Sequence, residues 1–445
     1  MGLFLSFFTN PVCLSIIVIT VLSLSKLSIP LTLVVGTLTA GFFGGMPLGR
    51  VIQVFSEGIS GGVNIALSYA FLGMFAAGLT AIGIPEFFAS KIANFEDGCP
   101  MKTGVRRAML FLFFCGIASQ TIIPVHIAFI PIIVPAFLSL FNGAKVDRRA
   151  VACILTFGLV GTYTFLPFGF GGIFLREVVL GNLQKQGIQL ALSNFDTVKL
   201  MFIPTAGMIL GLIFAVCVSY GRPRSYEKFQ IEVKHEHAVS KGTMLLGALA
   251  MVTMLTVQII FKSMVVGAFS GVMVLLLSGA LKWKNSDKIV TKGFGMMATI
   301  GMTMIIASGF SAVLSCTGAV NNLVSALLTV TSNNMHLTIL LMLVVGLIIT
   351  MGIGSSFSTV PILAAILVPI CQRIGLSAAS TFITLAVAGA LGDAGSVASD
   401  STLGPTTGLN VDGQHDHFKD SVIPTFLHFN IPLLIFGYIA IILFS

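Results

Sequence analysis

The sequence has few charged residues. Only 9% of its 445 residues are Asp, Glu, Lys or Arg, against roughly 25% in soluble domains. This scarcity excludes an ordinary soluble domain. The hydrophobic share is 56%, and apolar runs of about 20 residues, each long enough to cross a bilayer as a helix, recur from end to end. We therefore predict an all-α polytopic membrane protein that is embedded in the lipid bilayer.

The sequence also lacks period-two alternation and paired cysteine spacings. Long continuous apolar runs without alternation argue against strands. The seven cysteines are scattered without CxxC spacing, which argues against a disulfide framework or a thiolate metal site. The net charge of +8 comes from Lys and Arg in short connections between apolar runs. It therefore indicates membrane topology rather than nucleic-acid binding.

The apolar runs fall into two halves with the same order of segments. The N-terminus lacks a basic n-region and a cleavage site, so we predict that Pro11 to Ser25 is a first span rather than a signal peptide. The first half, 1–220, has predicted spans at 11–25, 29–46, 61–82, 150–175 and 199–220, with a Pro-interrupted stretch at 108–141. A linker, 221–241, precedes the second half, 242–445, with spans at 242–261, 264–281, 293–315, 378–402 and 424–444 and an interrupted stretch at 338–372.

Basic residues predict how these segments are oriented. Of the 24 Lys and Arg residues, eighteen fall in connections on one side of the membrane, which we assign as cytoplasmic. Both termini are then extracytoplasmic. The stretch 108–141 has basic flanks and is predicted as a re-entrant hairpin from the cytoplasm, whereas 338–372 enters from outside. Five spans per half make the second half inverted, and inverted repeats with broken helices are typical of secondary transporters.

The segment Gly389 to Leu409 carries the strongest functional signal. It continues an apolar run but contains five glycines, Pro405, several hydroxyls and two aspartates. A carboxylate at membrane depth costs roughly 3 kcal/mol, so we interpret the two aspartates as functional and expect the other fourteen acidic residues in loops. The alternative is that they cap helices. The predicted set that binds Na⁺ or H⁺ is Asp393, Asp400, Ser396, Ser399 and Thr402.

Three other irregular segments are expected to meet this one near mid-membrane. They are the two hairpin tips, 116–124 and 352–361, and a break at 161–172, which contains no acidic residue. Non-helical backbone at membrane depth must be buried in protein or line a cavity. The hydroxyls here could be ligands or could satisfy broken backbone, and the histidine could be a packed side chain or a proton relay. The predicted lining residues are Ser119, Gln120, Thr121, His126, Thr162, Thr164, Gly354, Ser355, Ser356 and Ser358.

Two further patterns suggest other chemistry. Asp412, His415 and His417 could hold a metal, but Asp412-Gly413 is typical of a turn, so we predict a solvated loop. Asp393 follows Ala390-Leu-Gly, a pattern close to the GxGD of intramembrane aspartyl proteases. That chemistry requires two carboxylates on facing helices, whereas both aspartates lie on one segment. We therefore predict that the protein is not an enzyme and needs no cofactor beyond Na⁺ or H⁺.

The run GDAGSVASDSTLGPTTGLNVDGQHDH, which begins at Gly392 and is followed later by PTFLHFNIPL, resembles the Na⁺/H⁺ antiporter family of bacterial inner membranes. The likeness is closer to a branch of proposed amino-acid permeases, some proposed to carry histidine. The resemblance implies inverted repeats, opposed hairpins, broken helices and often a homodimer. It also places the family's acidic motif on Asp393 and Asp400, with Ser396, Ser399 and Thr402.

Two functions remain open on this basis. In the first, Na⁺ and H⁺ compete for the same buried carboxylate, because burial disfavours its charged form, and alternating access turns this competition into antiport. In the second, the aspartates bind Na⁺ or H⁺ while a hairpin helix N-terminus binds an amino-acid carboxylate. The lack of Arg or Lys at membrane depth in the predicted spans argues against a strongly anionic substrate such as a dicarboxylate.

Overall fold

The computed structural model describes residues 10–25, 27–84, 101–121, 130, 133–135, 137–227, 240–261, 263–319, 322, 325, 329, 331, 334–396 and 399–445. The described residues are helices joined by turns and contain no strand. The first-half elements are α2 (Pro11–Leu24), α3 (Ile29–Phe43), α4 (Leu48–Gly58), α5 (Ser60–Ala81), α7 (Met101–Thr121), α9 (Leu138–Gly143), α10 (Arg148–Phe165), α11 (Phe170–Gly172), the π-helix η1 (Ile173–Leu180), α12 (Gly181–Lys185), α13 (Asn194–Phe214) and η2 (Ala215–Ser219).

The second half is helical in the same way. Its elements are α14 (Lys241–Phe261), α15 (Met264–Leu277), η3 (Trp283–Asn285), α16 (Ser286–Cys316), α18 (Met335–Ile353), α19 (Ser356–Arg373), α20 (Ala378–Ala390), the 3₁₀ turn η4 (Asp393–Gly395), α21 (Asp400–Leu409), η5 (His417–Val422), α22 (Ile423–Thr425), η6 (Phe426–Asn430) and α23 (Ile431–Leu443). Each of the ten predicted spans overlaps these helices, and some of them, including 150–175, 378–402 and 424–444, run across several elements.

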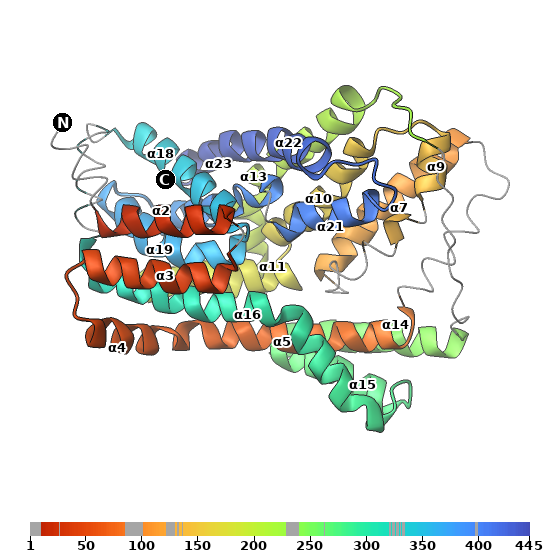
Figure 1. Cartoon of the computed structure of the whole chain (residues 1–445), viewed down its shortest axis with the longest axis horizontal. Helices are drawn as coiled ribbons and strands as arrows, with labels where there is room; N and C mark the ends of the chain where they lie inside the picture. Colours follow the sequence, from red (N-terminus) through yellow and green to blue (C-terminus); the bar gives the residue numbers. More distant parts are fainter. Residues whose placement is uncertain are drawn as a thin grey trace.

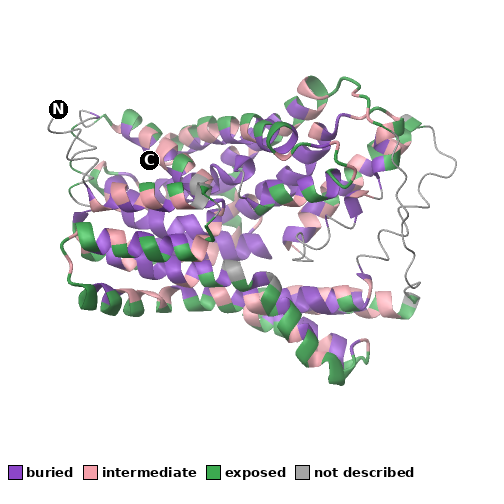
Figure 2. Ribbon diagram, in the orientation of Figure 1, coloured by how far each residue is buried: buried purple, intermediate pink, exposed green. Residues whose placement is uncertain are grey.

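Hydropathy and burial identify a polytopic membrane protein. Within the described residues, six helices are long and apolar enough to cross a bilayer, or seven when the bent pair Arg148–Phe165 and Phe170–Lys185 counts as one span. The outer faces of α13 and α14 carry exposed large apolar side chains such as Phe202 and Leu245, and Figure 2 shows exposed residues along the outward faces of the peripheral helices. Such surfaces are expected to face lipid.

The helices surround one large core. In Figure 1, α2, α3, α4, α5 and α16 lie as long neighbouring helices, whereas α10, α13, α21 and α23 form the other side of the bundle. Helices α5 and α16 approach closely because both present glycine: a Cβ built on Gly73 would lie 2.2 Å from the carbonyl oxygen of Gly293. Small residues at such crossings permit tight packing between membrane helices.

Three helix interruptions lie inside this bundle. Helix α10 ends at Phe165, and the chain resumes at Phe170 with a bend of 47°. Helices α18 and α19 are joined only by Gly354, which has a left-handed φ of 75°, and Ser355. Helix α20 is followed by η4 before α21 starts at Asp400. Residues 116–121 of the predicted first hairpin tip belong to helix α7, whereas 122–124 and His126 lie outside the described residues. The inverted-repeat and hairpin topology stays a prediction.

Candidate functional site

Asp393 lies in the interruption between α20 and α21. The helix stops because Gly392 has a φ of 91°, a left-handed conformation that glycine adopts without strain. A Cβ at Gly392 would lie 2.8 Å from the Leu347 carbonyl oxygen, so only glycine fits. The Gly392 backbone N–H donates to the side chain of Asn430 at 3.0 Å. This turn directs the Asp393 carboxylate into the protein, where the residue is 5% exposed.

Three hydroxyl groups from three different segments surround the Asp393 carboxylate. Tyr163 on α10 and Ser399 both donate hydrogen bonds to it, and Ser356 on α19 donates at 3.0 Å. The hydroxyls of Tyr163 and Ser356 are also within 2.7 Å of each other. No ion pair within the described ranges includes Asp393. It is therefore a buried carboxylate held by neutral donors without a basic partner.

Two helix N-termini also point toward this carboxylate. Ser356 is the first residue of α19, and Ser399 is the N-cap of α21, where its hydroxyl also accepts from the Ser401 N–H. The first turn of a helix carries a partial positive charge from its unpaired N–H groups. The N-termini of α19 and α21 therefore stabilise negative charge at Asp393. A partial charge of this kind does not neutralise the carboxylate as a bound proton or cation would.

A small cavity borders Asp393 and Asp400. Its volume is about 50 Å³, and a water occupies about 30 Å³ of liquid, so there is room for one or two water-sized species. Asp400, at the start of α21, is an exposed residue and faces this cavity. The lining residues are Tyr69, Gln120, Tyr163, Phe170, Gly354, Ser355, Phe357, Asp393, Asp400 and Ser401. The structure thus brings both predicted aspartates to one cavity, with Gln120, Gly354 and Ser355.

Several predicted hydroxyls instead bind backbone around the breaks. Ser396 donates to the Met351 carbonyl at 2.9 Å, and Thr402 donates to the Ser396 carbonyl at 2.6 Å. These two side chains fix the shape of the α20–α21 interruption. The other predicted hydroxyls mostly bind within their own segments. Ser119 donates to the Gly116 carbonyl, Thr121 to the Ile117 carbonyl, Thr164 to the Val160 carbonyl and Ser358 to the Ser355 hydroxyl, and Thr162 is buried.

The sequence-based list omitted two tyrosines and a carboxylate. Tyr163 contacts Asp393 directly, and Tyr69 lines the same cavity. Both tyrosines lie within apolar runs, and this pattern could have identified them, because a buried tyrosine hydroxyl needs a hydrogen-bond partner. The prediction that all other acidic residues lie in loops is wrong: Glu177 lies within η1, since the helix continues beyond the predicted end of the span, through Lys185. The first broken segment therefore also carries an acid.

The predicted solvated loop at Asp412 is confirmed only in part: Gly413 and Asp416 are exposed, whereas the side chains of Asp412 and His415 are buried. Asp412 forms an ion pair with Arg148 in which both side chains are fully buried. Arg148 Nη1 donates to the Leu409 carbonyl at 2.7 Å, and the Tyr226 ring packs 4.4 Å from the guanidinium carbon. The local turn exists, with Gly413 exposed at a φ of 74°, but the Asp412 side chain is buried against Arg148. This contact joins the start of α10 to the end of α21.

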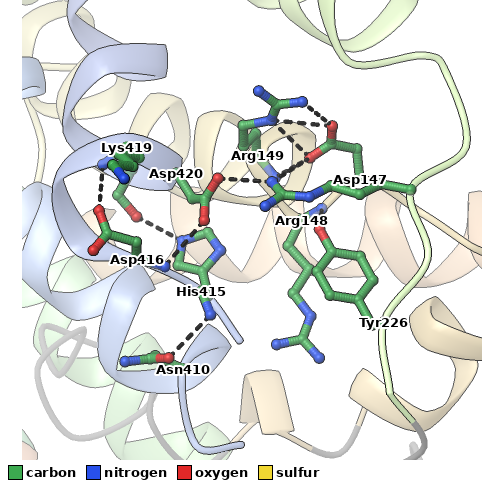
Figure 3. Close-up of polar contacts among 11 residues, drawn as sticks. Asp147, Arg148, Arg149, Tyr226, Asn410, His415, Asp416, Lys419 and Asp420 are labelled. Carbon is green, nitrogen blue, oxygen red and sulfur yellow. Dashed lines mark hydrogen bonds and ion pairs between the residues drawn. The ribbon is translucent and has the colours of Figure 1, made fainter. Parts of the chain in front are cut away.

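Further polar contacts lie around the start of α10 near Arg148 (Figure 3). Asp147, the N-cap of α10, pairs with Arg149 at 2.6 Å, and Arg224 pairs with Asp420 at 2.7 Å. His415 is 1% exposed, and its Nε2 lies 2.8 Å from the Ser421 hydroxyl. No group of three potential metal ligands occurs in the part of the chain that the structure describes. The network binds residues 224–226 and the 410–416 segment to α10.

Two further hydrogen bonds join α10 to the second broken segment, which comprises η4 and α21. Thr156 on α10 donates to the Ser401 carbonyl at 2.9 Å, and Tyr163, farther along α10, donates to Asp393. Arg148, Thr156 and Tyr163 thus connect α10 to the second broken segment along its length. Because these contacts join α10 to α21, we expect the Arg148 pair to help keep Ser399 at Asp393.

We expect His415 to make stability depend on pH. Burial lowers the pKa of His415 from 6.5 to about 4, although the nearby Asp420 opposes this. The unfolded chain therefore takes up a proton as pH falls below about 6.5, whereas the folded protein does so only near pH 4. The stability that neutral His415 provides is present above pH 6.5 and lost as pH falls toward 4. The loss is on the order of 2 kcal/mol.

The measurement is unfolding of the purified protein between pH 4.5 and 8. The stability advantage of wild type over His415→Gln should be constant above pH 7 and shrink below pH 6.5. His336→Gln, at an exposed histidine, controls for the loss of an imidazole. A difference between wild type and His415→Gln that stays constant over the whole range would contradict this account.

Comparisons with known proteins agree with a transport site. Sequence models described as "Na+/H+ antiporter family" and "Na+-H+ antiporter family" match residues 154–438 and 10–95. The chain is 47% identical over 437 residues to membrane protein VP2115 of Vibrio parahaemolyticus and 46% identical over 444 residues to a Haemophilus influenzae membrane protein, both described as uncharacterized; each alignment covers 97% of this chain and 99% of the relative.

A third relative carries a transport description. YuiF of Bacillus subtilis, described as a proposed amino acid transporter, is 41% identical over 441 residues, covering 97% of this chain and 99% of YuiF. Two solved structures share the fold. The YdaH transporter of Alcanivorax borkumensis has a TM-score of 0.61 at 14% identity, covering 88% of each chain. MtrF of Neisseria gonorrhoeae, described within a class of antimetabolite efflux pumps, has a TM-score of 0.56 at 15% identity, covering 88% of this chain and 84% of MtrF.

Proposed function

Because the chain belongs to the Na⁺/H⁺ antiporter family and is a membrane transporter, we propose that it exchanges Na⁺ for H⁺ at Asp393. The observation that carries this proposal is the environment of that carboxylate. Asp393 is buried and receives three hydroxyl hydrogen bonds. It has no ion pair with any basic side chain among the residues described.

A buried carboxylate of this kind favours neutralisation. An isolated charge in a low-dielectric interior costs several kcal/mol even after relaxation, and hydroxyl donors offset only part of that cost. Asp393 can be neutralised by a proton or by a small cation that displaces the proton. Na⁺ and H⁺ would then compete for one site. Competition at a site that opens alternately to the two sides is sufficient for antiport.

The size and chemistry of the cavity support an ion as the transported species. Its volume of about 50 Å³ is far below the roughly 300–1,000 Å³ of pockets that hold small organic ligands. Carboxylate and hydroxyl oxygens are suitable ligands for a hard cation. Asp400 at the cavity adds a second negative charge, which raises the local concentration of cations.

The predicted context of this site is part of the proposal. The protein would work in the bacterial inner membrane with both termini outside, and 108–141 and 338–372 would form opposed hairpins in inverted repeats. A homodimer would supply a fixed scaffold. The bend of 47° after Phe165 and the two-residue joint between α18 and α19 are the places where such a structure could change its access.

One observation favours a cation-coupled amino-acid permease as a second candidate. Gly354 and Ser355, which precede the N-terminus of α19, line the cavity together with Asp400. A helix N-terminus can bind a carboxylate, and an aspartate can pair with an ammonium group. YuiF, at 41% identity, is described as a proposed amino acid transporter. In this case Asp393 would hold the coupling Na⁺ or H⁺.

Purified protein in vesicles that contain a pH-sensitive dye distinguishes the two functions. The vesicles are given a Na⁺ pulse first and then each of a panel of amino acids. Antiport predicts a change of internal pH after Na⁺ alone. A pH change that requires an amino acid would support the permease, and the absence of both responses would contradict both functions.

A further inference from the structure

Glu177 is a carboxylate that the proposed mechanism does not use. It lies in η1, beyond the interruption at 166–169, and accepts a hydrogen bond from the Ser68 hydroxyl of α5 at 3.2 Å. It is only partly exposed. None of the ion pairs among the described residues includes it. Glu177 therefore resembles Asp393 in having a neutral hydroxyl donor and no basic partner.

Tyr69, the neighbour of Ser68 on α5, lies at the cavity. Tyr69 is 1% exposed, and its hydroxyl has no hydrogen-bond partner among the described residues. It lines the cavity that contains Asp393 and Asp400, and it lies near enough to feel the charge of both aspartates and of Glu177. An unsatisfied buried hydroxyl costs roughly 1–3 kcal/mol. A hydroxyl of this kind at a cavity is suited to bind a water or ion that enters it.

We propose that Glu177 is a second proton-binding carboxylate of the transporter and that the Tyr69 hydroxyl passes protons between it and Asp393. This inference rests on the proposed function. Protonated Glu177 gives its proton, through cavity water, to the Tyr69 oxygen, and Tyr69 releases its own proton toward Asp393. Glu177 ends as a carboxylate, Asp393 ends neutral, and Tyr69 is unchanged. When Na⁺ binds at Asp393, the proton leaves by the reverse route.

The other charged groups near Glu177 are few and engaged elsewhere. Arg176, on the same element, donates to the Asn194 side chain at 3.1 Å, and Lys185 on α12 donates to the Gly61 carbonyl at 3.0 Å. Helix α10 contributes Tyr163, which donates to Asp393. Helices α11 and α20, which also contact η1, contain no titratable side chain, and the Cys371 and Arg373 side chains of α19 lie in its last turn, far from the end that faces Asp393. Arg176 is near enough to act on the charge of Glu177, but the two form no ion pair among the described residues.

The test measures proton movement and Na⁺ binding separately. Wild type, Glu177→Gln and Tyr69→Phe are placed in dye-containing vesicles and given a Na⁺ pulse, and the Na⁺-induced rise in melting temperature is measured on the same proteins. We expect both variants to move protons at least about tenfold more slowly while keeping the Na⁺-induced stabilisation. Glu177→Asp should recover part of the rate. Glu57→Gln, an exposed glutamate on α4, should match wild type.

Each possible result either supports or overturns the proposed role of Glu177. A wild-type proton rate in Glu177→Gln overturns the proposal, and so does loss of the Na⁺-induced stabilisation together with the rate, because Glu177 would then be structural or a Na⁺ ligand. If wild type moves protons only when an amino acid is present, the proposed antiport is contradicted. The proton transfer through Glu177 and Tyr69 is then tested with the same variants, and the amino acid replaces Na⁺ in the pulse. If wild type moves protons with neither, both proposals are overturned.

Discussion

Replacing Asp393 with asparagine is expected to reduce Na⁺-driven proton movement to the level of protein-free vesicles, a loss of at least about 100-fold. Asparagine keeps the size of the side chain and one oxygen that can accept from Tyr163 and Ser356, which both donate to the same carboxylate oxygen of Asp393. It cannot bind or release a proton, and it offers Na⁺ no negative charge. The variant should also lose the Na⁺-induced rise in melting temperature.

The Asp393→Asn protein should nevertheless insert and fold, since the change removes a buried charge that has no basic partner. Its melting temperature without Na⁺ should be at least that of wild type. Asp287→Asn, at an exposed aspartate in the first turn of α16, is the matched control and should transport like wild type. Na⁺-driven proton movement at the wild-type rate in Asp393→Asn would refute the assigned role.

Replacing Arg148 with methionine is expected to destabilise the protein by about 3–5 kcal/mol, the typical cost when one partner of a buried ion pair is removed. Both side chains of the Arg148–Asp412 pair are fully buried, so Asp412 would be left as an unpaired charge. The Leu409 carbonyl would also lose its donor. Thermal or denaturant unfolding of the purified variant measures this loss.

The double variant Arg148→Met/Asp412→Leu should regain much of the lost stability, because replacing a whole buried pair with apolar groups is often neutral. Arg50→Met, at an exposed arginine on α4 whose side chain donates to Gln53, should change stability by less than about 0.5 kcal/mol. If Arg148→Met unfolds like Arg50→Met, the pair does not hold α10 and α21 together.

Local patterns in the sequence were sufficient to locate most of the long apolar helices and to single out Asp393, whereas α4 and α12 lie outside every predicted span. The apolar runs match the helical segments because hydropathy and length determine which segments can span a bilayer. Asp393 was identified because a charge within such a run is costly, and Gly392 in the same motif is the residue whose backbone conformation turns it inward. Each of these inferences depends only on residues that are close together in the sequence.

The remaining contacts depend on residues far apart in the chain. Tyr163 and Asp393 are separated by 230 positions, and Arg148 and Asp412 by 264. The Asp412-Gly413 turn was predicted correctly from its residues, but the burial of the Asp412 side chain depends on Arg148. Glu177 was missed because hydropathy falls at Arg176 and Glu177, whereas packing against α5 and α19 continues the helix.

The most direct test of competition between Na⁺ and H⁺ at Asp393 is the number of protons released when Na⁺ binds to the purified protein at several pH values. We expect each bound Na⁺ to displace close to one proton at low pH. In that range the affinity for Na⁺ should fall by up to about tenfold for each unit by which the pH is lowered. Asp393→Asn should release none. Wild-type protein that binds Na⁺ with no proton release and with the same affinity at every pH would contradict the account.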